Sequence, residues 1–356
     1  SLASTPLSGA DVEVIVNKPI AIYSGMVPGY VAGQYRVAEL EIDVPRLCSW
    51  AGVECTVEQV TVIDAPARQV ELADGRRLNY DLASVNIGST VAGLDLPGVR
   101  DSAIPTRPIS ELIHRTEEVV SRASNRQQET PFQVVVVGGG AGGVELAFTF
   151  LERLENAGCA PVETHLINSG PRILEGYPPS LANRAERAAI QRGIQIHCNQ
   201  RVQSADAGQI TLDSGEVWPC DALLWVTGAV SHPLFVDSGL PTDDRGFVET
   251  RSTLQVVGYD DLFGVGDCAT LIDFPTTPKA GVYAVRQGPV LTDNLRASLA
   301  GTPLRSYRPQ SDFLTLLNLG DGSALGSKKG LSFQGRWVMH LKDWIDRRFM
   351  QRFQLE

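Results

Sequence analysis

The sequence lacks any closely spaced pair of cysteines. Its six cysteines form no CxxC motif, and the two nearest to one another, Cys48 and Cys55, are separated by six residues. A large acidic α/β chain does not need disulfides, so we expect all six cysteines to be reduced and to act mainly as small buried side chains. The pattern therefore excludes a short redox pair and offers no metal-binding motif.

The chain also lacks long apolar runs and an excess of cations. No stretch of about 18 apolar residues occurs, so no transmembrane helix is expected. Residues 1–6 have neither a charged start nor a long apolar core, so we interpret them as the tail of a helix rather than a signal peptide. The formal net charge of −10 argues against a nucleic-acid binder, which needs cations to neutralise phosphates. A length of 356 residues allows two or three soluble domains.

Residues 133–168 have the pattern of a strand, a helix and a second strand. Gln133–Val137 is a continuous apolar run, which is typical of a strand buried on both faces. A helix is predicted over Val144–Ala157, ended by Gly158, and another strand over 164–167. This order predicts a parallel sheet with a right-handed crossover.

A glycine-rich loop joins the first of these strands to the helix. The loop fits the pattern G-x-G-x-x-G in the strand-to-helix context that the motif requires. Its glycines permit a tight turn and a close approach of the backbone, and the helix N-terminus attracts a pyrophosphate. We therefore predict dinucleotide binding through Gly138, Gly140, Ala141 and Gly143.

The ribose of that dinucleotide is expected beside Asn168, at the end of the second strand. An acidic residue in this place would hold the ribose 2′-hydroxyl, but Asn168 is neutral and is followed by Ser169 and Arg172. A neutral strand end with a nearby cation permits a 2′-phosphate. The sequence therefore leaves NADH and NADPH open, with Asn168 and Arg172 as candidate contacts.

The chain repeats this organisation. Residues 52–88 and 193–228 each run through a strand, a tight turn and a buried strand ending in glycine, Gly88 or Gly228. Residues 12–16 correspond to the second strand of the later unit, so extrapolation puts an earlier glycine loop about a dozen residues before the first residue. We predict an α/β protein with two Rossmann-like dinucleotide-binding domains, of which the first βα unit is truncated, and a small C-terminal segment.

Two carboxylates stand where a cofactor would meet them. Glu145, just inside the helix after the glycine loop, either complements the helix dipole or hydrogen-bonds a cofactor near a flavin. Asp267 follows Gly266 at the end of a buried strand, where it either caps the next element or accepts hydrogen bonds from the ribityl hydroxyls of a flavin. Given the repeat, we favour the flavin role for Asp267.

The order of these motifs resembles a known family. The glycine loop, the Thr227-Gly228 strand end, Gly266-Asp267 and the run Pro278-Lys279-Ala280-Gly281 are similar to the two-dinucleotide-binding-domain flavoproteins of the glutathione-reductase type. Within them the chain looks most like the type II NADH dehydrogenase and sulfide:quinone reductase branch. Residues 23–29 and the tail 342–350 are most similar to the flavoprotein module found alone or fused to selenide, water dikinase.

The resemblance implies roles for matching residues. Lys279 would lie at the pyrimidine edge of the flavin and stabilise its reduced anionic form, with Glu145 as a second catalytic residue. The alternative for Lys279 is a solvated surface cation. The residues implied in cofactor binding, from the isoalloxazine ring to the adenine, are Ser24, Gly25, Met26, Pro28, Val60, Gly88, Gly228, Gly266, Asp267 and Ala280.

The chain departs from that family in two respects. It has no closely spaced cysteine pair, so electrons have no dithiol to reach. The first glycine loop is absent and Asn17 takes the acidic ribose position of the first unit. The second departure predicts weak FAD binding, or none, by the chain as it stands.

Residues 337–353 form an amphipathic pattern. Five apolar residues recur at helical spacing, and Lys342, Arg348 and Arg352 fall at the edges of their face, where they could snorkel. The stripe is equally compatible with an anionic membrane surface, with the protein's own body and with a second copy in a homodimer. We expect a cytoplasmic location, or a peripheral one at the inner face of the membrane.

The function predicted from these features is a flavin-dependent oxidoreductase. NAD(P)H bound by residues 106–254 would pass hydride to FAD held by 1–105 and 255–300, and electrons would continue to a quinone or other small acceptor. Residues 301–356 form the C-terminal segment. The alternative is a non-catalytic nucleotide-binding regulatory or scaffold module linked to selenium metabolism.

Overall fold

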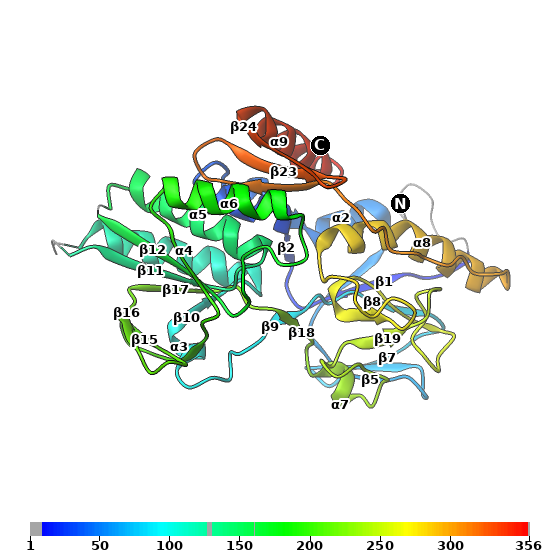
Figure 1. Ribbon diagram of the computed structural model, residues 1–356. Coiled ribbons are helices and arrows are strands. Elements are labelled where there is room, and N and C mark those ends of the chain that lie inside the picture. The colour runs from blue at the N-terminus through cyan, green and yellow to red at the C-terminus, as the bar shows by residue number, and fades with distance from the viewer. Residues whose placement is uncertain (1–8, 127–129, 160, 355–356) are drawn as a thin grey trace.

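The computed structural model describes residues 9–126, 130–159 and 161–354, so the helix tail expected at residues 1–6 lies outside the described residues. Two lobes lie side by side beneath a third, smaller layer (Figure 1). The second nucleotide-binding unit forms one lobe and the first unit forms the other. The C-terminal strands and helix form the third layer.

The second unit is built on five parallel strands in the order β10-β17-β11-β12-β13. Their bounds are Ala103–Pro105 for β10, Phe132–Val137 for β11, Val162–Asn168 for β12, Gln195–Cys198 for β13 and Ala222–Trp225 for β17.

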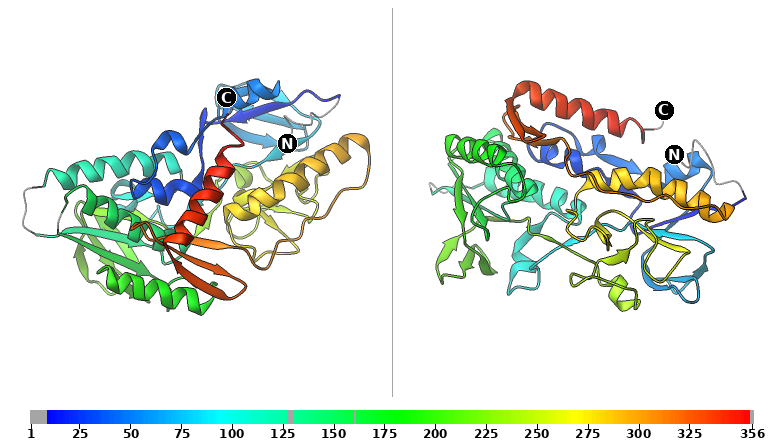
Figure 2. Two further views of the ribbon diagram at one scale, coloured as in Figure 1. Left: turned by 90° about the horizontal axis from the view of Figure 1, so that it is seen from above. Right: turned by 45° about the vertical axis from the view of Figure 1, so that its right-hand side comes forward.

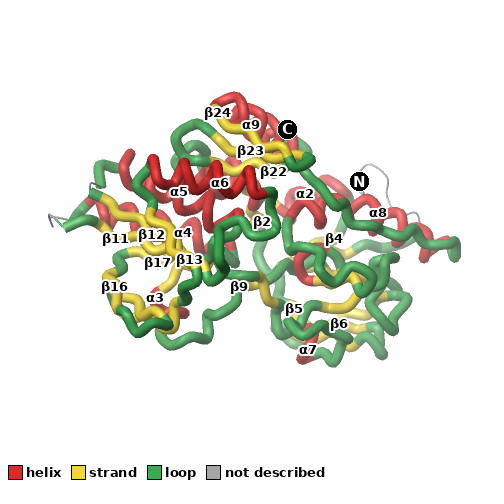
Figure 3. The backbone as a smooth tube through the Cα atoms, in the orientation of Figure 1, coloured by secondary structure: helices red, strands yellow, loops and turns green. Residues whose placement is uncertain are grey.

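Both faces of this sheet are covered, by helices on one side and by strands on the other (Figure 3). One face packs against the helices α4 (Ile109–Ser124), α5 (Ala141–Asn156) and α6 (Pro179–Gln191). The other packs against an antiparallel sheet of β14 (Val202–Asp206), β15 (Gln209–Leu212) and β16 (Val217–Pro219). As a result, residues 134–136 of β11 are fully buried, which confirms the two-sided burial predicted from the apolar run.

The first unit has no such continuous sheet among its described residues. β1 (Glu13–Val16) pairs in parallel with β4 (Glu54–Val57), and β8 (Ala83–Val85) pairs in parallel with β20 (Leu262–Gly264). These pairs are separate two-stranded sheets. A three-stranded antiparallel sheet contains β5 (Val60–Asp64), β6 (Gln69–Leu72) and β7 (Arg77–Asn79), and the helices of this lobe are α2 (Val44–Ala51) and α8 (Gly281–Ala300).

The two units match around one unmatched place. β1 and β4 correspond to β12 and β13, β8 corresponds to β17, and the hairpin sheet β5-β6-β7 corresponds to β14-β15-β16. No strand among the described residues of the first unit corresponds to β11. The repeat predicted from sequence is confirmed, and the earlier glycine loop, which would follow that strand, stays a prediction.

Short elements connect the units. β9 (Thr90–Val91) pairs with β18 (Ala229–Val230), and β19 (Val248–Thr250) pairs in parallel with β21 (Ala269–Leu271). Residues 229–254, which the sequence assigned to the second unit, pack on the first, because Phe235 and Val248 share a buried cluster with Ile63. The other short elements are β2 (Ile20–Ile22), η1 (Ser24–Met26), α1 (Val27–Val31), η2 (Val37–Glu39), β3 (Glu41–Asp43), α3 (Val99–Ser102), η3 (Gly266–Cys268) and α7 (Leu234–Asp237).

The C-terminal layer consists of an antiparallel sheet and the helix α9, which follows it directly (Figure 2). The strands are β22 (Thr315–Asn318), β23 (Ala324–Lys328) and β24 (Leu331–Gly335), and α9 spans Arg336–Met350. The amphipathic helix predicted over 337–353 is thus confirmed within a few residues. Among the described helices, none combines the length and the apolar character needed to cross a bilayer.

The prediction that Lys342 could snorkel at the edge of α9 is wrong. Its side chain is 7% exposed and lies on the buried face of the helix, beside Asp346. The stripe packs on the protein's own body around this ion pair, which was one of the alternatives left open by the sequence. Phe349 of the stripe stacks on Tyr23 of the first unit, with ring centroids 4.5 Å apart.

Candidate functional site

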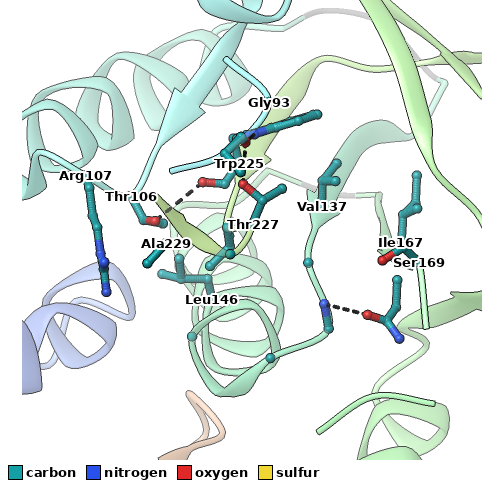
Figure 4. A pocket seen from close by; sticks show the side chains of 18 of the residues that line it. Gly93, Thr106, Arg107, Val137, Leu146, Ile167, Ser169, Trp225, Thr227 and Ala229 are labelled. Carbon is teal, nitrogen blue, oxygen red and sulfur yellow. Dashed lines mark hydrogen bonds between the residues drawn. The ribbon is translucent and has the colours of Figure 1, made fainter. Parts of the chain in front are cut away.

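A cavity of about 990 Å³ lies between the two lobes. The second unit lines it with the glycine loop, the start of α5 and the carboxyl ends of β11, β12 and β17. The opposite side is lined by Lys279 of the first unit and by Ser24 and Pro28, which come from η1 and α1, a segment that packs into the core of the second unit. Figure 4 shows Thr106 and Arg107 on one side of this space, Ile167 and Ser169 on the other, and Leu146 of α5 near the middle.

Two glycines of the loop lie too close to other backbone atoms to carry a side chain. A Cβ on Gly138, whose φ is +123°, would lie 2.2 Å from the Val226 carbonyl oxygen. A Cβ on Gly143 would lie 1.7 Å from the carbonyl oxygen of Gly138. The loop therefore closes directly onto the N-terminus of α5, and Gly140 and Gly142 at that terminus line the cavity, an arrangement that suits a pyrophosphate.

The Asn168 side chain connects two segments at the cavity through hydrogen bonds. Its Oδ1 accepts a hydrogen bond from the Gly139 N–H at 3.2 Å. Its Nδ2 donates to the carbonyls of Gly170 at 3.1 Å and Arg172 at 2.8 Å. Both amide hydrogens are therefore used within the protein, and the side chain fixes the glycine loop against residues 170–172.

Glu145 reaches the cavity from the first turns of α5. Its Oε1 accepts a hydrogen bond from the Asn318 N–H of β22 at 2.8 Å. Burial raises the pKa of Glu145 to about 7, although Lys342 and the Asn318 N–H act in the opposite direction. This carboxyl group can therefore take up or release a proton near neutral pH, which suits a general acid or base.

Three polar groups behind Glu145 connect α9 to the first unit. Lys342 Nζ donates to Asp346 Oδ2 at 2.9 Å and to the Gly25 carbonyl at 2.8 Å. The Tyr23 hydroxyl donates to Asp346 Oδ1 at 3.1 Å. Burial alone would lower the pKa of Lys342, but Glu145 and Asp346 together raise it, so the ammonium stays charged.

Lys279 lines the cavity from the loop before α8. Its Nζ donates to the Ala269 carbonyl and to Thr270 Oγ1 and lies 3.9 Å from the centre of the Phe247 ring. Burial lowers the pKa of Lys279 to about 8. The alternative interpretation of Lys279 as a solvated surface cation is therefore wrong. Its role toward a flavin stays a prediction.

Asp267 lies outside the cavity lining and is paired within the protein. Its Oδ2 is 3.0 Å from Arg107 Nη2, and Gly266, in η3, donates its N–H to Gln287 Oε1 at 2.6 Å. Arg107 itself lines the cavity, so Asp267 is connected to the site through this ion pair.

The structure brings together part of the predicted set. The predicted residues that line the cavity are Ser24, Pro28, Gly138, Gly140, Glu145, Asn168, Gly228 and Lys279. The others lie outside the lining, namely Gly25, Met26, Val60, Gly88, Ala141, Gly143, Arg172, Gly266, Asp267 and Ala280. Met26 is fully buried in the core, and the Arg172 guanidinium donates to the Tyr177 carbonyl. Their roles in cofactor binding stay predictions.

Sequence reasoning missed several lining residues. Gly93, Arg107 and Arg201 lie in connectors or turns that carry no motif, and they reach the cavity only through the way the chain folds back. The proline-rich segment 91–108 could have been predicted to line the cavity, because such a connector must pass between the two units. The six cysteines are free thiols, and none lines the cavity.

Comparisons with known proteins agree with this architecture. The profile of the pyridine nucleotide-disulphide oxidoreductase family matches residues 3–288. The chain is 28% identical over 304 residues to the demethylphylloquinone reductase NdbB of Synechocystis sp., a match that covers 82% of this chain and 72% of that protein. It is 24% identical over 340 residues to the type II NADH:quinone oxidoreductase of Staphylococcus saprophyticus, covering 89% and 82%.

Solved structures have the same fold. The sulfide:quinone oxidoreductase from Aquifex aeolicus superposes with a TM-score of 0.82 at 15% identity, over 96% of this chain and 85% of that one. The Plasmodium falciparum NDH2 in complex with RYL-552 superposes with a TM-score of 0.80 at 11% identity, over 98% and 95%. On the family match over most of its length, the chain belongs to the pyridine nucleotide-disulphide oxidoreductase family.

Proposed function

We propose that the protein is an FAD-dependent NAD(P)H dehydrogenase that passes electrons to a quinone. The observation that carries the proposal is the single cavity, which both units line and which joins the glycine loop to Ser24, Pro28 and Lys279. Such a cavity lets a nicotinamide meet a flavin directly. Names of relatives that reduce quinones support the same acceptor class.

The second unit fits a nicotinamide dinucleotide. Gly138 and Gly143 leave no room for side chains, so the backbone stays open to a pyrophosphate at the N-terminus of α5. Trp225 and Thr227 close the far wall, since both donate to the Ala92 carbonyl, at 2.7 and 2.6 Å. This wall would shield the nicotinamide end from water.

The first unit fits the ring end of FAD better than its phosphate end. Ser24, Pro28 and Lys279 lie at the cavity, and Arg107 connects Asp267 to it. Among the described residues of this unit, no glycine-rich loop leads from a strand into a helix as Gly138–Gly143 does. FAD, when bound, supplies the two-electron chemistry that joins a hydride donor to a quinone.

The protein's own part in turnover would be positioning and proton handling. Glu145 holds a proton at its carboxyl group near neutral pH, at the cavity wall. Lys342 keeps a fixed positive charge behind it, so an incoming negative charge at the site is partly balanced. Quinone reduction consumes protons, and Glu145, with a pKa of about 7 at the cavity wall, is placed to deliver one.

The exposed face of the C-terminal layer supports contact with a membrane surface, where quinones dissolve. Trp337 and Trp344 of α9 are 57% and 56% exposed, and Leu331 of β24 is 73% exposed. Arg348 lies over the Trp344 ring at 5.2 Å. Tryptophans with flanking cations are typical of helices at the headgroup level of a bilayer.

Reconstitution tests the enzymatic proposal. We expect the chain saturated with FAD to be yellow and to oxidise NADH or NADPH in the presence of a water-soluble quinone. Glu145→Gln should lower the quinone-dependent rate without loss of flavin absorbance. A colourless protein without turnover, when FAD is in excess, would contradict the proposal and favour the non-catalytic nucleotide-binding module, whose tie to selenium metabolism stays a prediction.

Vesicle sedimentation tests the membrane contact. We expect binding to vesicles of anionic phospholipid and its loss in the double variant Trp337→Ser, Trp344→Ser. Trp50→Ser is the matched control, because Trp50 is 62% exposed on α2 of the first unit. Equal vesicle binding by the double variant and the control would show that this face is not the one in contact.

A further inference from the structure

We propose that the nucleotide site prefers NADPH, and that Arg201 with Ser169 binds the 2′-phosphate of its adenosine ribose. The inference rests on the proposed function, because it specifies the nucleotide that the second unit holds. Neither Arg201 nor Ser169 belongs to the residues predicted from sequence. Both line the cavity at the end where β12 and β13 finish.

The usual contact to a ribose 2′-hydroxyl is missing at this end. In dinucleotide-binding folds an acidic side chain at the end of the second strand accepts from that hydroxyl. Here Asn168 occupies the place, and its Nδ2 is already committed to the carbonyls of Gly170 and Arg172. The strand end therefore provides no carboxylate, and its amide serves the protein's own loop.

Arg201 is held close to that strand end by its backbone neighbours. The Gln200 N–H donates to the Asn168 carbonyl at 3.2 Å, and the Asn199 N–H donates to the Gly170 carbonyl at 3.0 Å. Arg201 is the next residue. Its own N–H donates to Asp213 Oδ1 at 3.3 Å, and its carbonyl accepts from the Asp213 N–H at 2.9 Å. The backbone is thus fixed while the side chain stays exposed.

The Arg201 guanidinium has no ion pair, hydrogen bond or ring contact among the described residues. The other cations that line the cavity are engaged, Arg107 with Asp267, Lys279 with Thr270 and Arg245 over the Phe247 ring. An unpaired guanidinium at the cavity wall can form two parallel hydrogen bonds to a phosphate. Ser169, also exposed on the wall, adds a hydroxyl donor.

Two carboxylates lie nearby and must be weighed against the proposal. Asp213 lines the cavity, but its Oδ1 accepts the Arg201 N–H, so the group is partly used. Glu175 Oε2 lies 2.7 Å from where a Cβ on Gly170 would be, yet Glu175 is not part of the lining. At this end the lining therefore holds Arg201 and Ser169 together with Asp213, whose Oδ1 is engaged by the Arg201 backbone.

The test compares two fragments that differ only in the 2′-phosphate. Calorimetric titration of the full chain with adenosine 2′,5′-bisphosphate and with adenosine 5′-monophosphate requires neither FAD nor turnover. We expect the bisphosphate to bind at least about tenfold more tightly, about 1.4 kcal/mol. Arg201→Ala should abolish that preference, and Arg201→Lys should keep part of it. Arg187→Ala on α6, an exposed arginine outside the lining, should leave it unchanged.

The outcomes separate this inference from the proposed function. Equal affinity for the two fragments would overturn the inference, even if the FAD-loaded chain oxidises NADH. Loss of the preference in Arg172→Ala but not in Arg201→Ala would also overturn it, and would return the site to the residue expected from sequence. A preference that depends on Arg201 supports the inference, and absence of any NAD(P)H oxidation would then count against the proposed function alone.

Discussion

The two lobes carry the same succession of elements, but among the residues that the structure describes only the second is built around a central strand. In that lobe β11 lies between β12 and β17, and residues 134–136 are fully buried. In the first lobe β1 and β8 have one partner each, and most residues of these two strands are only half buried. These two strands of the first lobe are therefore less buried than their counterparts in the second.

The first lobe is held instead by contacts that lie away from that centre. Phe263 is fully buried against the face of α8 that carries Val290. Ile63 and Phe235 form a second cluster under the hairpin sheet. The lesson is that the hairpin sheet, α8 and the connecting segment supply a core of their own, whereas the parallel strands supply the surface on which a nucleotide would lie.

The largest expected effect comes from the buried ion pair of Lys342 with Asp346 on α9. Lys342→Met leaves Asp346 and Glu145 buried without their cation, so the free energy of unfolding should fall by about 3–5 kcal/mol. Arg348→Met, an exposed cation of the same helix, should change it by less than about 0.5 kcal/mol. Urea denaturation of both variants measures the difference, and similar midpoints would contradict the assigned role of Lys342.

The next effect concerns the glycine loop of the second lobe, which has no counterpart among the described residues of the first. Gly143→Ala places a methyl group 1.7 Å from the Gly138 carbonyl oxygen. We therefore expect the free energy of unfolding to fall by at least about 2 kcal/mol and the binding of ADP-ribose to be lost. Gly140→Ala is the control for folding, because nothing lies within 4 Å of its added Cβ. Calorimetry and thermal unfolding report both properties. Normal nucleotide affinity in Gly143→Ala would refute the tight loop.

A third prediction concerns the unmatched place in the first lobe. A chain that carries a strand and a glycine loop ahead of Ser1, at the distance extrapolated from the repeat, should bind FAD at least about tenfold more tightly than the 356-residue chain. Visible absorption during FAD titration measures this. If the two chains bind FAD with equal affinity, the added strand and loop do not form the FAD site, and the prediction is wrong.

Much of this comparison could be predicted from the sequence. The strand, loop and helix over 133–157 follow from an apolar run and glycine spacing, which are local properties of the chain. The burial of Lys342 could not be predicted, because an isolated helix gives no sign that Asp346 and Gly25 will meet its ammonium group. Arg201 was missed for a similar reason, since a turn reaches the cavity only once the sheet is assembled.

The pH dependence of stability sharpens the role of Glu145. Its folded pKa of about 7 lies above its ordinary value of 4.5, so the native state holds the proton more tightly than the unfolded chain. Its contribution to stability is therefore present at low pH and is lost as pH rises from about 4.5 to about 7. Glu145→Gln should remove that slope. Parallel stability curves of the two proteins from pH 4.5 to pH 8 would contradict the buried carboxyl.

The smallest effect is expected at a pair of histidines on β12 and β13 of the second lobe. His165 Nδ1 lies 3.2 Å from His197 Nε2, and burial lowers the pKa of both. Both are neutral when folded, so stability should fall as pH drops below about 6.5. His197→Gln should weaken this acid sensitivity by a few tenths of a kcal/mol to about 1 kcal/mol. An unchanged acid midpoint in that variant would show that the pair does not govern it.

The way Asn168 is bonded has a consequence for anyone who wishes to redesign coenzyme choice. Replacing Asn168 with an acid, the obvious move toward NADH, would turn a carboxylate onto the carbonyl oxygens of Gly170 and Arg172 and collapse the turn that frames the ribose. Engineering should therefore begin on the neighbouring turn that carries Arg201 and leave the Asn168 amide unchanged.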